Sequence, residues 1–192
     1  MNRISAYLDT LRDVVAKAEI SRADGSAMEL EGTLDELGRH MRAAHDQGQK
    51  LMFVGNGGSA GICSHMATDY SKNGKLRSMA FNDGSFLTCL GNDLGYDRVF
   101  SEQIEFHGKS GDILIAISSS GRSPNILNAV KTARDKGCMV VTLSGFAADN
   151  PLRRAGDVNI YLNNMEYGFV EVGHLAVLHA VLDLHMGWKP AL

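Results

Sequence analysis

Histidine and carboxylate residues fall at helical spacings in two distant parts of the chain. His65 and Asp69 are four residues apart, so on a helix they lie on one face. Glu171 and His179 are eight residues apart in an apolar stretch, which puts them on roughly the same side of a helix but about 12 Å apart along its axis. One metal ion reaches both only if the two side chains lean toward each other. Glu171 and His174, three residues apart, form a more compact alternative pair.

Two histidines and two carboxylates on two helices, in an otherwise apolar setting, suit a Zn²⁺-type site with nitrogen and oxygen ligands. The predicted metal ligands are His65, Asp69, Glu171 and His179. Their spacing matches no short zinc motif, and His65 taken singly could equally be a hydrogen-bonded group of the core. The sequence therefore indicates a candidate metal site and leaves that structural alternative open.

A glycine-rich segment, Gly55–Ser59, follows a short apolar run and precedes a helical pattern. Glycines let backbone N–H groups approach a ligand closely, and a helix N-terminus presents unpaired donors with a partial positive charge. The segment has neither the Lys of a Walker A loop nor the third Gly of a dinucleotide-binding fingerprint. It indicates an anion or sugar site, with a simple tight strand-to-helix turn as the alternative.

A second polar loop, Ser118–Pro124, follows another apolar run. Pro124 suits the first position of a helix, and Ser123 is a natural N-cap. Capping needs one hydroxyl, whereas this loop supplies four serines. Because phosphate oxygens are all acceptors, the sequence predicts a phosphate held mainly by hydroxyls and amides, with Arg122 turned toward solvent.

These loops need a sheet to bring them together, and the second part of the chain predicts one. Short apolar runs alternate with helical patterns, which is typical of a parallel sheet covered on both faces. In such sheets ligands bind beyond the carboxyl ends of the strands. The predicted strands are 51–54, 78–81, 113–117, 139–143 and 158–161, and the predicted helices lie near 60–73, 96–106, 124–136 and 166–187.

The first part of the chain has a different pattern. Apolar residues at helical spacing predict one amphipathic helix over 2–20 and, after a polar break at 21–26, a second that ends near Gly48. We therefore expect residues 1–48 to form a helical hairpin and residues 49–192 to form the main domain. The hairpin serves either in oligomerisation or in ordinary packing on the core of the same chain.

Composition narrows the classes of function. The net charge of −3 leaves no basic footprint for nucleic acid. Apolar runs such as 113–117 fall far below the roughly 18–20 residues of a membrane span, and charged residues stand where a signal peptide has an apolar core. The three cysteines are odd in number and widely spaced, which favours a reducing compartment such as the cytoplasm.

The order and spacing of these motifs resemble a known family. Gly55–Ser59 before a helix, then Gly91-Asn92-Asp93, then Ile117–Ser123 is similar to the sugar isomerase (SIS) fold, and more closely to bacterial sedoheptulose 7-phosphate (phosphoheptose) isomerases. The resemblance implies an α/β fold with a doubly wound, five-stranded parallel sheet flanked by helices. It also implies a cytoplasmic homotetramer with active sites at subunit interfaces, which isomerises a phosphorylated sugar for heptose biosynthesis.

The resemblance also assigns roles to residues. Asp69 would be the carbon base and His179 its acid/base partner, although Asp69 cannot serve fully as base and zinc ligand at once. Zn²⁺ held by His65, Asp69, Glu171 and His179 would polarise the sugar oxygens. The expected substrate-binding residues are Asn56, Gly57, Gly58, Ser59, Asp93, Ser118, Ser119, Ser120, Ser123 and Glu171.

Three positions depart from the family pattern. Asp69 stands for a Glu, Glu171 for a Gln, and Gly168 for an Asp. These changes leave three alternatives: the heptose phosphate isomerase, an isomerase for a different sugar phosphate, and a non-catalytic module that binds a sugar phosphate or docks a protein. The retained histidines and carboxylates favour an enzyme. The missing fingerprint disfavours a dinucleotide-binding domain.

Overall fold

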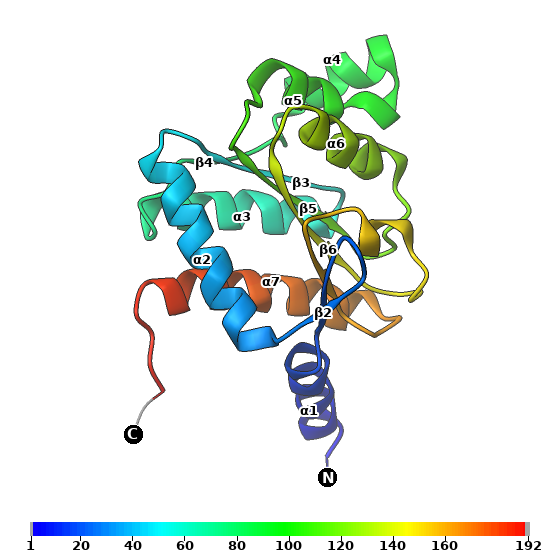
Figure 1. The fold of residues 1–192 in the computed structure, drawn as a ribbon. Helices are drawn as coiled ribbons and strands as arrows, with labels where there is room; N and C mark the ends of the chain where they lie inside the picture. Colours follow the sequence, from blue (N-terminus) through cyan, green and yellow to red (C-terminus); the bar gives the residue numbers. More distant parts are fainter. Residues whose placement is uncertain (1, 191–192) are drawn as a thin grey trace.

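The structure, a computed structural model, describes residues 2–190 and is built on one seven-stranded sheet of order β2-β1-β7-β6-β5-β3-β4 (Figure 1). Five strands pair in parallel and lie within one residue of the predicted ranges, so the predicted parallel sheet is confirmed. They are β3 (Leu51–Gly55), β4 (Ser78–Ala80), β5 (Ile113–Ser118), β6 (Met139–Ser144) and β7 (Val158–Tyr161).

The N-terminal segment differs from the predicted helical hairpin. It contains α1 (Arg3–Ala16), β1 (Glu19–Arg22), β2 (Ala27–Met28) and α2 (Leu30–Asp46). The helix expected over 2–20 is therefore too long, because its last residues extend the sheet: β1 pairs antiparallel with β7, and Ile20 is buried opposite Ile160. The domain boundary at residue 48 and a role of the segment in oligomerisation stay predictions.

Helices cover both faces of the sheet, as a doubly wound fold requires (Figure 1). Successive strand residues point to opposite faces, and they divide between two cores. Phe53 and Ile115 belong to a core with α2, α3 (Gly58–Lys72) and α7 (Tyr167–His185). Met52 and Leu114 belong to a core with α4 (Gly84–Leu94), α5 (Ser101–His107) and α6 (Pro124–Asp135).

Helix α7 is the most apolar helix that passes near the polar loops. With 19 residues and a mean hydropathy of 1.3, it satisfies the length and composition of a membrane span, which the count of purely apolar runs did not predict. In the fold it contacts α1, α2 and α3, and Val177 and Val181 are buried in the core. The same apolar character is typical of the core helix of a soluble protein.

Candidate active site

A cavity of about 270 Å³ lies where β3 and β5 end. Its position confirms the expectation that the two polar loops meet beyond the carboxyl ends of parallel strands. Most of the predicted substrate-binding residues line it, together with two that the sequence did not single out, Ile117 and Tyr167. The lining residues from the predicted set are Asn56, Gly57, Gly58, Ser59, Ser118, Ser119, Ser120, Ser123 and Glu171.

Glycines shape the loop between β3 and α3. A Cβ on Gly55 would lie 2.9 Å from the backbone of Ser59, and Gly57 has a φ of 53° that favours glycine. A Cβ on Gly58 would overlap the Glu171 carboxylate. The loop thus allows close packing at the start of α3, and it lets a carboxylate from α7 reach the cavity.

The hydroxyls of the serine loop are not used to cap helix α6, and that of Ser119 has no partner among the described residues. Ser123 is the N-cap residue of α6, yet its side chain makes no capping hydrogen bond; its Oγ lies 3.3 Å from that of Ser118. The Ser119 hydroxyl is buried without a partner among the described residues. Arg122 does not line the cavity, and it pairs with Asp149 on the surface. The wall therefore offers hydroxyl donors and helix N-termini rather than a cation, which is the arrangement predicted for phosphate.

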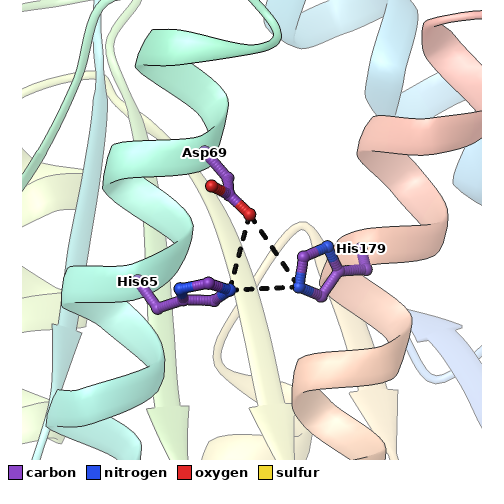
Figure 2. A group of neighbouring side chains, drawn as sticks. All are labelled: His65, Asp69 and His179. Carbon is purple, nitrogen blue, oxygen red and sulfur yellow. Dashed lines mark hydrogen bonds and ion pairs between the residues drawn. The ribbon is translucent and has the colours of Figure 1, made fainter.

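His65, Asp69 and His179 converge in a second cluster (Figure 2). His65 and Asp69 are one turn apart on α3, and His179 faces them from α7. The Nε2 atoms of His65 and His179 are 3.3 Å apart. Asp69 Oδ2 lies 3.4 Å from His65 Nε2 and 4.0 Å from His179 Nε2. The predicted convergence of two distant segments is thus present.

This triad, as we call His65, Asp69 and His179, has a donor set that suits a metal ion. Nitrogen and oxygen ligands about 2.0–2.1 Å from a tetrahedral ion lie roughly 3.3 Å from one another, close to two of the three observed separations, 3.3 and 3.4 Å, while the third is 4.0 Å. The side chains keep contact with solvent, with His65 53% exposed and Asp69 20% exposed. The cluster is therefore a candidate metal centre that a substrate can reach.

Three other expected residues lie elsewhere. Glu171 lines the cavity and is not one of the three residues whose donor atoms converge, so its role as a metal ligand stays a prediction. Asp93 is exposed in the last turn of α4, where it accepts a hydrogen bond from Asn92, and it does not line the cavity. His174 is fully buried, with Nε2 3.1 Å from the carbonyl oxygen of Ser144, which excludes the compact pair with Glu171.

The doubly wound sheet with a polar cavity at the carboxyl ends of its strands defines a class of ligand-binding α/β domain, and comparisons show the family. A family model described as "SIS domain" matches residues 16–145. The phosphoheptose isomerase of Bradyrhizobium sp. (strain ORS 278) is 40% identical over 94% of this chain and 90% of its own. The phosphoheptose isomerase of Pelobacter propionicus is 31% identical over 91% of this chain and 96% of its own length.

Solved structures lead to the same family. The phosphoheptose isomerase GmhA from Neisseria gonorrhoeae superposes with a TM-score of 0.79 at 29% identity, covering 95% of this chain and 97% of that one. The chain belongs to the SIS domain family, and within it to the phosphoheptose isomerases.

Proposed function

We propose that this protein is an aldose–ketose isomerase that converts sedoheptulose 7-phosphate to a heptose 7-phosphate for heptose biosynthesis. One observation carries the proposal: helices α3 and α7, which carry the triad, also contribute Ser59 and Glu171 to the wall of the hydroxyl-lined cavity. The relatives named phosphoheptose isomerase, at 31–40% identity over most of the chain, support the substrate.

The spacing along the helices favours a sugar with its phosphate far from the reacting carbons. Ser59 at the cavity and His65 in the triad are six residues apart on α3, or about 9 Å. Glu171 and His179 are eight residues apart on α7, or about 12 Å. A phosphate fixed by the serines therefore places the other end of an extended sugar at the triad, where proximity lowers the barrier.

Isomerisation moves a proton between C1 and C2 through an enediol, and two triad residues suit the transfers. Asp69 Oδ2 faces both imidazoles, which leaves Oδ1 to take the proton from one carbon and return it to the other. His179 is positioned to exchange a proton with the sugar oxygens. This division lets Asp69 hold a cation through one oxygen and act as base through the other.

Zinc is the metal proposed for the triad. His65, Asp69 and His179 would hold it, and Glu171 would be a fourth protein ligand only if its side chain leaned away from the cavity toward His179. When bound, zinc would supply Lewis-acid polarisation of the carbonyl and hydroxyl oxygens. Glu171 already lines the cavity, where its carboxylate can instead accept a hydrogen bond from a sugar hydroxyl.

The assembly we propose is a cytoplasmic homotetramer with active sites at subunit interfaces. Helix α1 has no buried residue, and its Ile4 and Leu8 side chains are 70% and 57% exposed. Such an apolar stripe favours contact with another copy. The cysteines Cys63, Cys89 and Cys138 are all free, which agrees with a reducing compartment.

The direct test combines metal analysis with an isomerisation assay. The purified protein should hold about one zinc per chain and convert sedoheptulose 7-phosphate, followed by nuclear magnetic resonance of the sugar carbons. His65→Ala should lose both metal and turnover, while His40→Ala, an exposed histidine on α2, should keep both. Turnover of another ketose phosphate, with none of sedoheptulose 7-phosphate, would refute the proposed substrate. Absence of metal and of turnover on a panel of sugar phosphates would refute the enzyme in favour of a binding module.

A further inference from the structure

The amide of Asn56, which lines the cavity, is held by two residues that do not line it. Asn56 Nδ2 donates to Asn125 Oδ1 at 3.0 Å, and Asn125 Nδ2 donates back to Asn56 Oδ1 at 2.9 Å. The hydroxyl of Tyr96 also donates to Asn56 Oδ1, at 3.1 Å. Three hydrogen bonds from two distant segments thus converge on one side-chain amide.

These bonds determine what Asn56 can offer a ligand. An amide oxygen has two acceptor positions and an amide nitrogen has two N–H donors. Asn125 and Tyr96 fill both acceptor positions of Asn56, and Asn125 takes one donor. One N–H remains, so Asn56 meets a ligand in the cavity only as a hydrogen-bond donor.

Asn125 is well suited to hold this amide in place. It lies in the first turn of α6 and is 2% exposed, so its own amide is confined by packing. Without it, the terminal torsion of Asn56 has two broad, nearly equivalent orientations. One of them would turn the amide oxygen toward a phosphate, whose oxygens are also acceptors.

We propose that Asn125, assisted by Tyr96, is a positioning residue that locks the Asn56 amide with its N–H toward the oxygens of the bound sugar phosphate. The proposal rests on the function proposed above. Asn125 touches Asn56 and acts through it, whereas Tyr96 extends the same network to the 3-10 turn Tyr96–Arg98 that follows α4. The Asn128 amide of α6 donates a hydrogen bond to the carbonyl of Asp97 in that turn and makes none to Asn56 among the described residues.

A double-mutant cycle tests the proposal. Asn125→Leu should raise KM for the sugar phosphate and the Kd of inorganic phosphate about tenfold, the equivalent of one hydrogen bond, with kcat within about twofold. In an Asn56→Ala background the same change should alter either constant by less than about twofold, because its effect passes through Asn56. Asn128→Ala is the matched control and should leave both constants unchanged.

Tyr96→Phe provides a second arm, since it removes one hydroxyl from a side chain that is 59% exposed and leaves the packing in place. It should raise the Kd of phosphate about threefold, and this effect too should vanish with Asn56→Ala. Additive effects in both cycles would overturn the proposal and make Asn125 a purely structural residue. Because phosphate binding is read by calorimetry without turnover, a coupled cycle in a protein with no isomerase activity would uphold the positioning role while refuting the proposed function.

Discussion

Ser118 and Ser119 are neighbours in the serine loop but differ in what their hydroxyls do for the fold. Ser118 Oγ accepts a hydrogen bond from the Gly121 N–H at 3.2 Å. Ser119 Oγ is buried beside the cavity without a partner among the residues described. A buried hydroxyl with no partner costs stability, so the structure tolerates it where a ligand would supply the missing acceptor.

Ser119→Ala should therefore separate binding from stability. We expect the free energy of unfolding to stay equal or rise slightly, and KM for the sugar phosphate to rise about tenfold or more, since a hydrogen bond to a charged group contributes about 1.5–3 kcal/mol. Ser118→Ala should lower stability as well as affinity. Urea unfolding and steady-state kinetics measure both quantities, and an unchanged KM for Ser119→Ala would place the phosphate elsewhere.

The sequence located the triad but not all of the site. His65 and Asp69 share a helical face through spacing alone, so their proximity could be predicted. Spacing alone could not show that Glu171 lines the cavity while His179 joins the triad. The direction of a long side chain depends on its neighbours, and the Glu171 carboxylate lies against Gly58, which has no side chain to displace it. Tyr167 had no signal in the sequence: it lines the cavity because α7 begins at that residue.

At the scale of elements, the junction between β3 and α3 has two glycines with different requirements, Gly55 at the end of the strand and Gly58 at the start of the helix. A Cβ on Gly55 would meet the backbone of Ser59 at 2.9 Å, whereas the atoms nearest to a Cβ on Gly58 would be those of the flexible end of Glu171. Backbone cannot move aside without disturbing the helix, while a carboxylate can rotate away.

Gly55→Ala should accordingly destabilise the protein by about 1–3 kcal/mol through overpacking. Gly58→Ala should keep the melting temperature within a few degrees but displace the Glu171 carboxylate and reduce turnover. Differential scanning calorimetry and the isomerisation assay distinguish the two variants. Equal destabilisation by both would show that Glu171 is held rigidly in place.

Most of the parallel strands were predictable because β3, β5, β6 and β7 are short, largely apolar runs buried on both faces, whereas β4 at the sheet edge is half-buried. Strands β1 and β2, at the other edge of the sheet, were not predictable. β1 has a single fully buried residue, Ile20, and it falls inside the stretch 2–20 that the apolar spacing predicted as one helix, so only its pairing with β7 makes it a strand. Helix α4 also escaped prediction, because it includes Gly84 and Gly91 and has only Leu90 fully buried, which weakens its helical pattern.

For the whole molecule, His174 couples stability to pH. Burial lowers the pKa of His174 from its usual 6.5 to about 4, although its hydrogen bond to the Ser144 carbonyl opposes the shift. In the unfolded chain this imidazole therefore binds a proton below pH 6.5, whereas in the native state it binds one only below about pH 4. This contribution is complete above pH 6.5 and is lost as the pH falls to about 4.

In the metal-free protein, the free energy of unfolding should fall by about 3 kcal/mol between pH 6.5 and about pH 4 because of this residue alone. His174→Asn should be less stable at neutral pH but lack that part of the pH dependence. Urea unfolding of both proteins at several pH values, in the presence of a chelator, gives the comparison. Parallel pH profiles would mean that His174 does not titrate in this way.

The exposed stripe of α1 gives a prediction for the assembly. Leu8→Asp should break the proposed tetramer into smaller species and reduce activity, with the far-ultraviolet circular dichroism preserved, because Leu8 is exposed in the single chain. Thr10→Asp on the same helix adds the same charge and is the control. Sedimentation equilibrium reports the mass, and a tetramer that survives Leu8→Asp would exclude α1 from the interface.

The central claim is that a sugar phosphate held by the serine loop is isomerised at the triad, with Asp69 as the base. Asp69→Asn tests it most directly, with turnover of sedoheptulose 7-phosphate and binding of that sugar measured on one preparation of known metal content. The account predicts a loss of turnover of at least about 100-fold, the lower range for general acid–base catalysis, with sugar-phosphate affinity retained. Full activity in the Asp69→Asn protein would contradict it.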